Sequence, residues 1–301
     1  FLSITNSKRI SCFFAFIFSF LFLRELGRAI NPQFSIILLI LGLFFIWRIY
    51  QLEKNNKKFI LYNGLLGIVV GALLYIYPYF WTALAVLYGI VLLIKAIEWK
   101  NLLLSAKNLL VFLITVGLFA APYIFNQFRA FNNPAYAETL LRMGLLNNHW
   151  PACYYNVALA IFTLFLLMLV KKKIKDQKLF LFSLALLSSA IIINWQNVIT
   201  GKYLLFSSHY YQVTVLFVVI VLAVISAALK EKLILKAKLV SFRRLFLFLL
   251  ISLPLVFLVY RQWEPVKEIL LASVSPKNMT SLQSLAPVFD WLNFHTSKDS
   301  V

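Results

Sequence analysis

Residues 152–195 read ACYYNVALAIFTLFLLMLVKKKIKDQKLFLFSLALLSSAIIINW. Two apolar runs, 152–170 and 179–195, stand on either side of a short segment that contains five lysines. Each run approaches the roughly 20 apolar residues that an α-helix needs to cross a bilayer. Because lipid cannot hydrogen-bond a bare backbone, runs of this length are expected to be α-helices. This stretch therefore predicts two membrane-spanning helices joined by a basic loop.

The same pattern extends along the whole chain. Of its 301 residues, 62% are hydrophobic and 13% are charged, whereas about 25% are charged in ordinary soluble domains. Strands of a β-barrel would be shorter and strictly alternating, and no such alternation occurs. We therefore expect an all-α fold, a polytopic transmembrane helical bundle of about nine spans. The spans predicted from hydropathy are 10–23, 34–47, 60–77, 79–96, 108–125, 152–170, 179–195, 212–229 and 245–260.

Lysine and arginine are distributed unevenly between the two sets of loops. Of the 29 basic residues, 20 fall on one side of the predicted bundle and 9 on the other. The positive-inside rule places the richer side, which includes residues 171–178, in the cytoplasm. We expect an N-terminus inside, a C-terminus outside and location in the plasma (inner) membrane. The net charge of +19 is explained by this topology, so it does not call for a nucleic-acid partner.

The sequence changes character from residue 261 onward, where mixed polarity replaces the apolar spans. Apolar side chains at helical spacing over residues 288–292 predict a helix that is followed by a polar loop. We expect a transmembrane helical domain at 1–260 and the beginning of an extracytoplasmic domain, truncated, at 261–301. Because the first residue is Phe1 rather than methionine, we also expect a fragment that lacks N-terminal spans.

Three features between and within the spans suggest structural roles. Gly64, Gly67 and Gly71 lie on the third predicted span, and small residues at this spacing let helices pack closely. The aromatic residues of 75–81 surround Pro78 at a predicted outer turn, where they suit the membrane interface, with stacking on a sugar as the alternative. The mixed segments 97–107 and 230–244 predict short helices lying on the cytoplasmic surface.

Side chains capable of chemistry gather on the predicted outer side. All three histidines and six of the ten carboxylates fall there, and two loops, 128–151 and 194–211, hold most of the candidates. Lysine and histidine suit a phosphate, whereas asparagine and threonine suit a sugar hydroxyl or a phosphate oxygen. The alternative is that these residues only cap the loops and anchor them at the membrane interface. The residue types alone do not decide between a binding site and such an interfacial loop. The candidates in these loops are Arg142, His149, Asn197, Thr200, Lys202 and His209.

The sequence lacks the motifs that several other functions require. The sequence has no spacing of histidine and cysteine that suggests metal ligands, and no glycine-rich nucleotide loop, which excludes nucleotide-driven pumps. A transporter would require ionisable residues along a path through the spans, and the predicted spans are nearly free of them.

Four short motifs carry a resemblance to a known family. They are Arg28 followed by Asn31-Pro32-Gln33, the glycine span ending in YIYPYFW (75–81), Arg142-x-Gly144 with His149 nearby, and NVITGK (197–202) with His209-Tyr210 following. Together they resemble bacterial members of the GT-C glycosyltransferase superfamily, which are multi-span enzymes that take sugar from a polyprenyl-phosphate donor.

The resemblance implies a hexosyltransferase in which the lipid bilayer and a polyprenyl-phosphate-linked sugar are the partners, with transfer at the outer face. The substrate-binding residues would be Arg28, Arg142, His149, Asn197, Thr200, Lys202 and His209, and a divalent metal is compatible with the resemblance. The family's catalytic carboxylate lies in the first outside loop, where no acid of this chain matches. We expect that acid upstream of Phe1 and the chain alone to be inactive. The alternatives are a non-enzymatic lipid or polysaccharide transporter, a polymerase-associated subunit and an outer-face polysaccharide polymerase.

Overall fold

The computed structural model describes residues 8–26, 31–54, 56–136, 138, 145–151, 153–204, 209–233 and 252–260. The chain divides into two compact units, residues 1–255 and 256–301, and helices α2 to α10 belong to the first. The extracytoplasmic domain expected at 261–301 lies outside the described residues.

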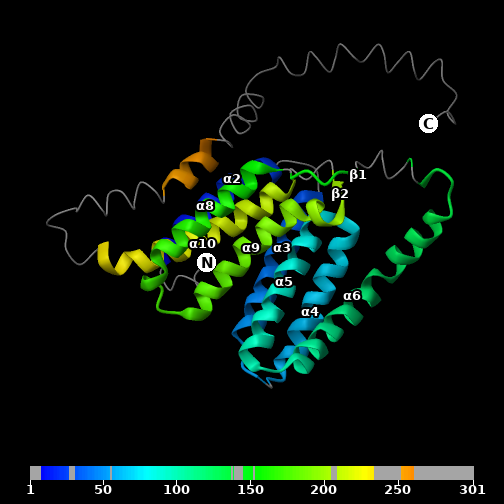
Figure 1. Cartoon of the computed structure of the whole chain (residues 1–301), viewed down its shortest axis with the longest axis horizontal. Helices are drawn as coiled ribbons and strands as arrows, with labels where there is room; N and C mark the ends of the chain where they lie inside the picture. The colour runs from blue at the N-terminus through cyan, green and yellow to red at the C-terminus, as the bar shows by residue number, and fades with distance from the viewer. Residues whose placement is uncertain are drawn as a thin grey trace, which may run out of the picture. The chain divides into compact units, whose positions relative to one another are not determined.

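Helices make up nearly all of the described chain (Figure 1). In chain order they are α2 (Lys8–Leu26), α3 (Asn31–Gln51), α4 (Lys58–Ile76), α5 (Pro78–Trp99), α6 (Leu102–Phe131), α8 (Tyr154–Val170), the 3-10 turn η1 (Lys171–Lys173), α9 (Gln177–Thr200) and α10 (Tyr210–Leu233). A further helical segment covers residues 252–260. Among the described residues, seven helices, α3 to α6 and α8 to α10, are long and apolar enough to cross a membrane. The predicted all-α fold is therefore confirmed, with seven candidate membrane-spanning helices, while the count of nine spans stays a prediction.

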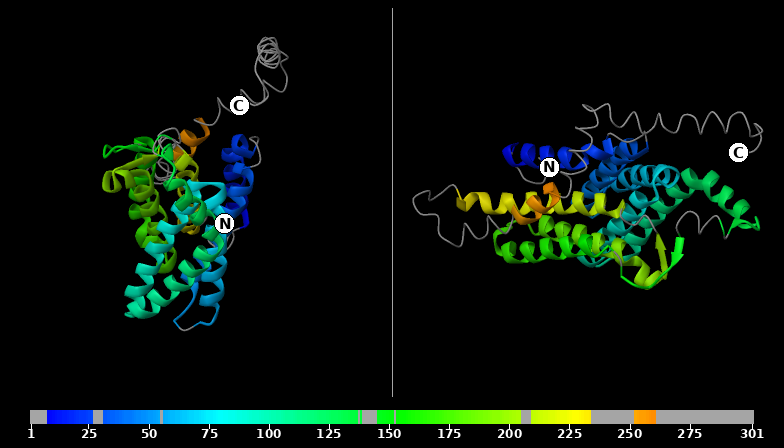
Figure 2. Two further views of the ribbon diagram at one scale, coloured as in Figure 1. Left: turned by 90° about the vertical axis from the view of Figure 1, so that its right-hand side faces the viewer. Right: turned by 90° about the horizontal axis from the view of Figure 1, so that it is seen from above.

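The helices pack in two groups. Helices α3, α4, α5 and α6 pack against one another, helices α8, α9 and α10 form the second group, and α5 joins the groups through α9 (Figure 2). Helix α10 is the most enclosed, because all its side chains from 211 to 219 are buried. Helix α6 is peripheral and buries only Ser105, Asn108, Phe112 and Ala120. Its second half diverges from the bundle in Figure 1, so most of its apolar surface faces outward, as lipid contact requires.

The glycines of α4 differ in their surroundings. A Cβ atom added at Gly67 would lie 2.7 Å from the Thr115 Cβ, and one added at Gly71 would lie 2.6 Å from the Phe119 Cβ. Both neighbours belong to α6. A Cβ at Gly64 would meet no atom within 4 Å. The predicted close packing is confirmed at Gly67 and Gly71, which form the contact with α6, but not at Gly64.

The separate surface helix predicted for residues 97–107 is wrong. Helix α5 continues to Trp99, the chain turns at Lys100 with φ of 50°, and α6 starts at Leu102. The Asn101 side-chain oxygen accepts a hydrogen bond from the Leu104 backbone N–H at 2.9 Å and so caps α6. Residues 102–107 are therefore the first turns of a 30-residue helix that is long and apolar enough to cross a membrane. Most of the second segment, 230–244, lies outside the described residues.

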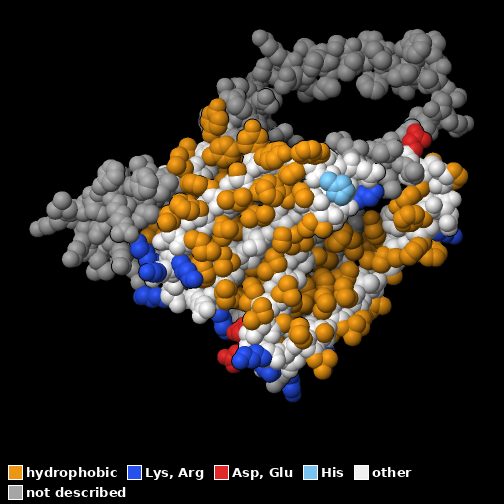
Figure 3. Space-filling view, in the orientation of Figure 1, with side chains coloured by type: hydrophobic (Ala, Val, Ile, Leu, Met, Phe, Trp, Pro, Cys, Tyr) orange, Lys and Arg blue, Asp and Glu red, His pale blue; other side chains and the backbone are white. Residues whose placement is uncertain are grey.

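Loops that the basic residues assign to one side do lie at one end of the bundle. The Lys54 ammonium group donates to the Trp99 carbonyl at 3.4 Å, which joins the α3–α4 loop to the end of α5. Residues 175–178 line a cavity together with Tyr50 and Glu98, so the α8–α9 turn lies at the same end. Figure 3 shows lysine and arginine along the lower edge of one face, below a surface of hydrophobic side chains. The grouping of these loops is confirmed, and their cytoplasmic location stays a prediction.

Lys95 is a buried lysine near the end of α5. It lies within α5 and is only 1% exposed. Its ammonium group donates to the Leu52 carbonyl at 3.1 Å and pairs with Glu98 at 3.0 Å. It also lies over the rings of Tyr50 and Trp99, at 5.1 and 5.2 Å from their centroids. Because every partner belongs to the end of α3 or to α5, this buried lysine joins those two helices.

Candidate functional site

The two polar loops singled out in the sequence, 128–151 and 194–211, pair with each other through one short strand from each. Strand β1 (Leu145–Asn147) runs antiparallel to β2 (Lys202–Leu204), with Asn147 opposite Lys202. The pairing continues as the Asn148 N–H donates to the Gly201 carbonyl at 3.0 Å. This two-stranded ribbon places residues far apart in sequence, such as His149 and Lys202, at the same end of the bundle.

A sharp turn at the end of α9 makes this ribbon possible. Gly201 closes the helix with φ of 66°, a left-handed conformation that favours glycine, and its N–H donates to the Asn197 carbonyl at 2.8 Å. A Cβ atom at this position would also lie 2.6 Å from Nε2 of His149. Glycine is therefore required twice, for the turn and for the close approach of the histidine ring.

Asn197 fastens one loop to the other. Its side chain is 1% exposed, and its Nδ2 donates to the carbonyls of Asn148 and Trp150 at 3.1 and 2.7 Å. His149 Nδ1 lies 3.1 Å from the Val198 carbonyl, which adds a second link. In this arrangement the Asn197 amide protons are committed to the protein backbone, so its evident role is to position the loop.

Replacing Asn197 by alanine is expected to loosen the ribbon. Two backbone carbonyls lose their donor, at a net cost of about 1 kcal/mol. Amide hydrogen exchange at Asn148 and Lys202 should then quicken roughly fivefold if it follows this local opening. Asn126→Ala, on the exposed outer part of α6, provides the control and should change neither rate. Unchanged exchange in the Asn197 variant would contradict the fastening role.

A groove of about 350 Å³ lies beside the ribbon. Its lining comes from α5, α9, β2 and the start of α10, and consists of Trp81, Thr82, Ala85, Val86, Ile193, Gln196, Lys202 and Tyr210. Apolar side chains form its α5 and α9 walls, whereas Lys202 and Gln196 add polar groups near the ribbon. The hydroxyls of Thr82 and Tyr210 are hydrogen-bonded to each other at 2.9 Å across it. The groove thus combines an apolar wall with one cation.

Lys202 is held in position from two sides. Its ammonium group donates to the Asn147 side-chain oxygen at 2.7 Å, and its carbonyl accepts a hydrogen bond from Gln196 Nε2 at 2.9 Å. Thr200 Oγ1 donates to Gln196 at 2.9 Å and accepts from the Lys202 N–H at 3.2 Å. A lysine ammonium has three N–H donors. The hydrogen bond to Asn147 therefore orients Lys202 and leaves capacity to bind an anion.

His209 lies in an aromatic cluster next to the groove. Its Nδ1 is hydrogen-bonded to the Tyr77 hydroxyl, and its ring stacks on Tyr79 with centroids 5.0 Å apart. Tyr79 in turn meets the ring of Tyr210, which lines the groove, at 5.2 Å. The cluster fixes the start of α10 against the start of α5, and it places His209 beside the groove rather than in its lining.

The structure brings together most of the predicted site residues that it describes. His149, Asn197, Thr200 and Lys202 meet at the ribbon, and of these Lys202 lines the groove. Arg28 and Arg142 lie outside the described residues. Sequence reasoning missed Thr82, Gln196 and the wall residues of α5 and α9. The only signal for them was their closeness in sequence to Trp81 and Asn197, because the groove forms only when the helices pack.

The groove and the ribbon contain no metal-ligand set. Within the described ranges, no three histidine, cysteine, aspartate or glutamate side chains come together in a way that could hold a metal ion. No protein-family model, curated protein or solved structure was found to match this chain.

Proposed function

We propose that this chain is the membrane-embedded part of a glycosyltransferase that takes a sugar from a polyprenyl-phosphate donor at the outer face of the membrane. The observation that carries the proposal is the groove beside the ribbon, which has an apolar wall and a single oriented lysine. The resemblance of the sequence to the GT-C superfamily supports the same assignment.

The groove suits the two chemical parts of such a donor. A polyprenyl chain is apolar, and Ala85, Val86 and Ile193 offer it a wall that already belongs to apolar helices. The phosphate is anionic, and Lys202 offers it an ammonium group. A hydrogen bond to a charged group contributes about 1.5–3 kcal/mol, roughly twice that of a neutral pair. Lys202 is therefore expected to dominate recognition of the phosphate.

The remaining lining suits the sugar. Trp81 offers a flat ring, and Gln196 offers an amide that can donate and accept hydrogen bonds. An arrangement of one aromatic face with a few polar groups is typical of small-molecule sites. The Thr82 and Tyr210 hydroxyls stand next to them.

The expected chemistry is direct displacement at the anomeric carbon, with the acceptor hydroxyl attacking as the lipid phosphate leaves. Lys202 would stabilise the charge that develops on that phosphate. No carboxylate lines the groove within the described part of the chain, so the residues there bind the donor and do not remove the proton. The acid that removes it belongs outside this groove.

The proposal includes the topology that places the groove outside. With nine spans and the basic loops in the cytoplasm of the plasma membrane, the ribbon and the start of α10 are extracytoplasmic. Both predicted outer loops then contribute to one site, since β1 and β2 come from different loops.

Replacing Lys202 by alanine is expected to weaken binding of polyprenyl phosphate about tenfold, which corresponds to about 1.4 kcal/mol. Lys202→Arg should retain most of the binding, because an ammonium here acts mainly as a point charge. Binding is measured as thermal stabilisation of the detergent-solubilised protein over a range of polyprenyl-phosphate concentrations.

Arg129→Ala serves as the matched control, since this arginine is also exposed and belongs to the outer part of α6 but does not line the groove. Transfer of label from polyprenyl-phosphate hexose in membranes containing the intact protein tests the reaction itself and should fall in Lys202→Ala. Equal binding by the wild type and Lys202→Ala would remove the groove from the donor site. Absence of transfer by the intact protein would refute the enzymatic assignment.

A further inference from the structure

A second cavity lies at the basic end of the bundle, opposite the ribbon. It has a volume of about 650 Å³ and is formed by the end of α5 and the start of α9, with Tyr50 from α3. Ile94, Ile97 and Leu181 provide apolar lining, and Lys175 and Lys178 provide cations. A volume of this size is within the range of small-molecule sites.

The two carboxylates that line the cavity already have partners. Glu98 pairs with the buried Lys95 at 3.0 Å. Asp176 caps α9, and its Oδ1 accepts hydrogen bonds from the N–H groups of Lys178 and Leu179 at 2.8 and 3.2 Å. Glu98 is thus paired with Lys95, and Asp176 is held by its two backbone hydrogen bonds at the start of α9.

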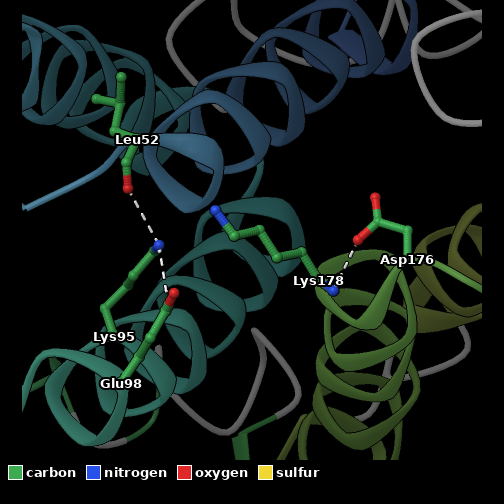
Figure 4. A network of polar contacts seen from close by, with 5 residues as sticks. All are labelled: Leu52, Lys95, Glu98, Asp176 and Lys178. Carbon is green, nitrogen blue, oxygen red and sulfur yellow. Dashed lines mark hydrogen bonds and ion pairs between the residues drawn. The ribbon is translucent and has the colours of Figure 1, made fainter.

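The Lys178 ammonium group has no hydrogen bond or ion pair with any other residue in the described part of the chain. Figure 4 shows its side chain extending from the start of α9 toward the pair formed by Lys95 and Glu98. The nearby turn adds further positive charge, since residues 171–178 contain five lysines and one aspartate. With Lys95 counted beside its partner Glu98, three lysines face two carboxylates at the cavity, so its net charge is positive and favours an anion.

The apolar lining of the cavity continues onto the lipid-facing surface of α5. Ile97 is 78% exposed, and Leu93, one helical turn earlier on the same face, is 62% exposed. These side chains offer an apolar strip that leads away from the two lysines toward the middle of the membrane span. A ligand with an anionic head and an apolar chain would match both parts.

We propose that this cavity binds the headgroup of an anionic phospholipid of the bilayer, with the phosphate at Lys175 and Lys178 and an acyl chain along Ile97 and Leu93. Basic pockets between membrane helices at the cytoplasmic face are suited to such headgroups. Because the end of α5 and the start of α9 both form the cavity, the bound lipid links the two helix groups. This site is distinct from the proposed donor groove at the other end of the bundle.

The test measures retention of phosphatidylglycerol by the solubilised, delipidated protein, using native mass spectrometry and the shift in thermal unfolding. Wild type is expected to retain phosphatidylglycerol and to be stabilised by it, and phosphatidylcholine at the same concentration should have much less effect. The variant Lys175→Gln/Lys178→Gln should bind phosphatidylglycerol at least tenfold more weakly. Both lysines are exposed, so the variant is expected to fold.

Lys172→Gln is the matched control, because this exposed lysine belongs to the same basic turn but does not line the cavity. Its phosphatidylglycerol affinity should stay within twofold of the wild type. Equal binding of the two lipids, or an equal loss in Lys172→Gln, would show general attraction to the basic surface and overturn the proposal. Equal stabilisation by inorganic phosphate would also overturn it, since that result needs no acyl chain.

Discussion

Replacing Gly67 by leucine is expected to separate α6 from α4 and to cost roughly 3 kcal/mol of folding free energy, at the upper end of the usual range for overpacking. A Cβ at this position would already lie 2.7 Å from the Thr115 Cβ and 3.0 Å from the Phe112 carbonyl oxygen. One of these atoms belongs to backbone, so the side chains of α6 cannot relieve the clash by rotating. The whole helix would have to move.

Helix α6 packs mainly on α4. Its four buried side chains all come from residues 105–120, the part that packs on the bundle. Membrane helices associate through close packing rather than through a hydrophobic force, because lipid is as apolar as the helix surface. The Gly67 contact is therefore a main part of what holds α6, beside the Gly71 contact and the hydrogen bond from the Tyr75 hydroxyl to the Phe119 carbonyl at 3.0 Å.

Two alanine variants of α4, one at a tightly packed glycine and one at a glycine in open space, test this prediction. Gly67→Ala should destabilise the protein by about 1–3 kcal/mol, whereas Gly64→Ala, in open space, should gain about 0.5–1 kcal/mol from helix propensity. The measurement is thermal or detergent-induced unfolding of the purified protein. Equal stability of the two alanine variants would mean that α4 and α6 do not pack closely.

The second large effect is expected at Asn194, in the middle of a buried polar network. Its side-chain oxygen accepts a hydrogen bond from Asn156 Nδ2 at 2.8 Å, and its own Nδ2 donates to Thr214 Oγ1 at 2.9 Å and to the Ala190 carbonyl at 2.8 Å. These three helices, α8, α9 and α10, form one of the two packing groups. Asn194→Leu removes every interhelical bond of the network at once.

The expected loss for Asn194→Leu is about 2 kcal/mol. A buried donor left without an acceptor costs about 1–3 kcal/mol. Interhelical hydrogen bonds measured in membranes average about 0.6 kcal/mol with a maximum near 1.7, because the unfolded chain also finds partners. The value expected here is above that of one bond because two interhelical bonds are lost and the amide of Asn156, which is 4% exposed, is left unpaired.

The double variant Asn156→Leu/Asn194→Leu distinguishes a hydrogen-bond effect from a packing effect. With both polar partners gone, no buried amide is orphaned, so the double variant should be at least 1 kcal/mol more stable than the sum of the single losses predicts. Additive losses in a double-mutant cycle of unfolding measurements would show that the two amides are not coupled.

The helical bundle could be predicted because its signal is local. In residues 154–170 the run of apolar side chains is itself the reason that the segment enters lipid, and its hydrogen bonds join residues four apart. The ends of helices were less predictable. Residues 102–107 contain a lysine and a serine and were assigned to the membrane surface, yet capping by Asn101 starts α6 there.

The candidate site was only partly predictable for a related reason. Lys202 stood out by its charge in a polar loop, and the structure places it in the groove. Thr82 and Ile193 carried no such signal, because a threonine or an isoleucine in an apolar run becomes part of a groove only when another helix lies opposite. Nothing local in the sequence indicates that Lys95 is buried, because its partners Tyr50 and Leu52 come from the end of α3 and the residue directly after it.

The sequence by itself determined that this chain forms helices long and apolar enough to cross a membrane, and which basic loops share an end, because apolar length and loop charge are read without any tertiary contact. The tertiary structure alone decided that β1 pairs with β2, that Gly67 packs where Gly64 does not, and that Asn197 is used to fasten a loop. Each of these depends on atoms brought together from residues about 50 positions apart, and no local pattern specifies which distant segments meet.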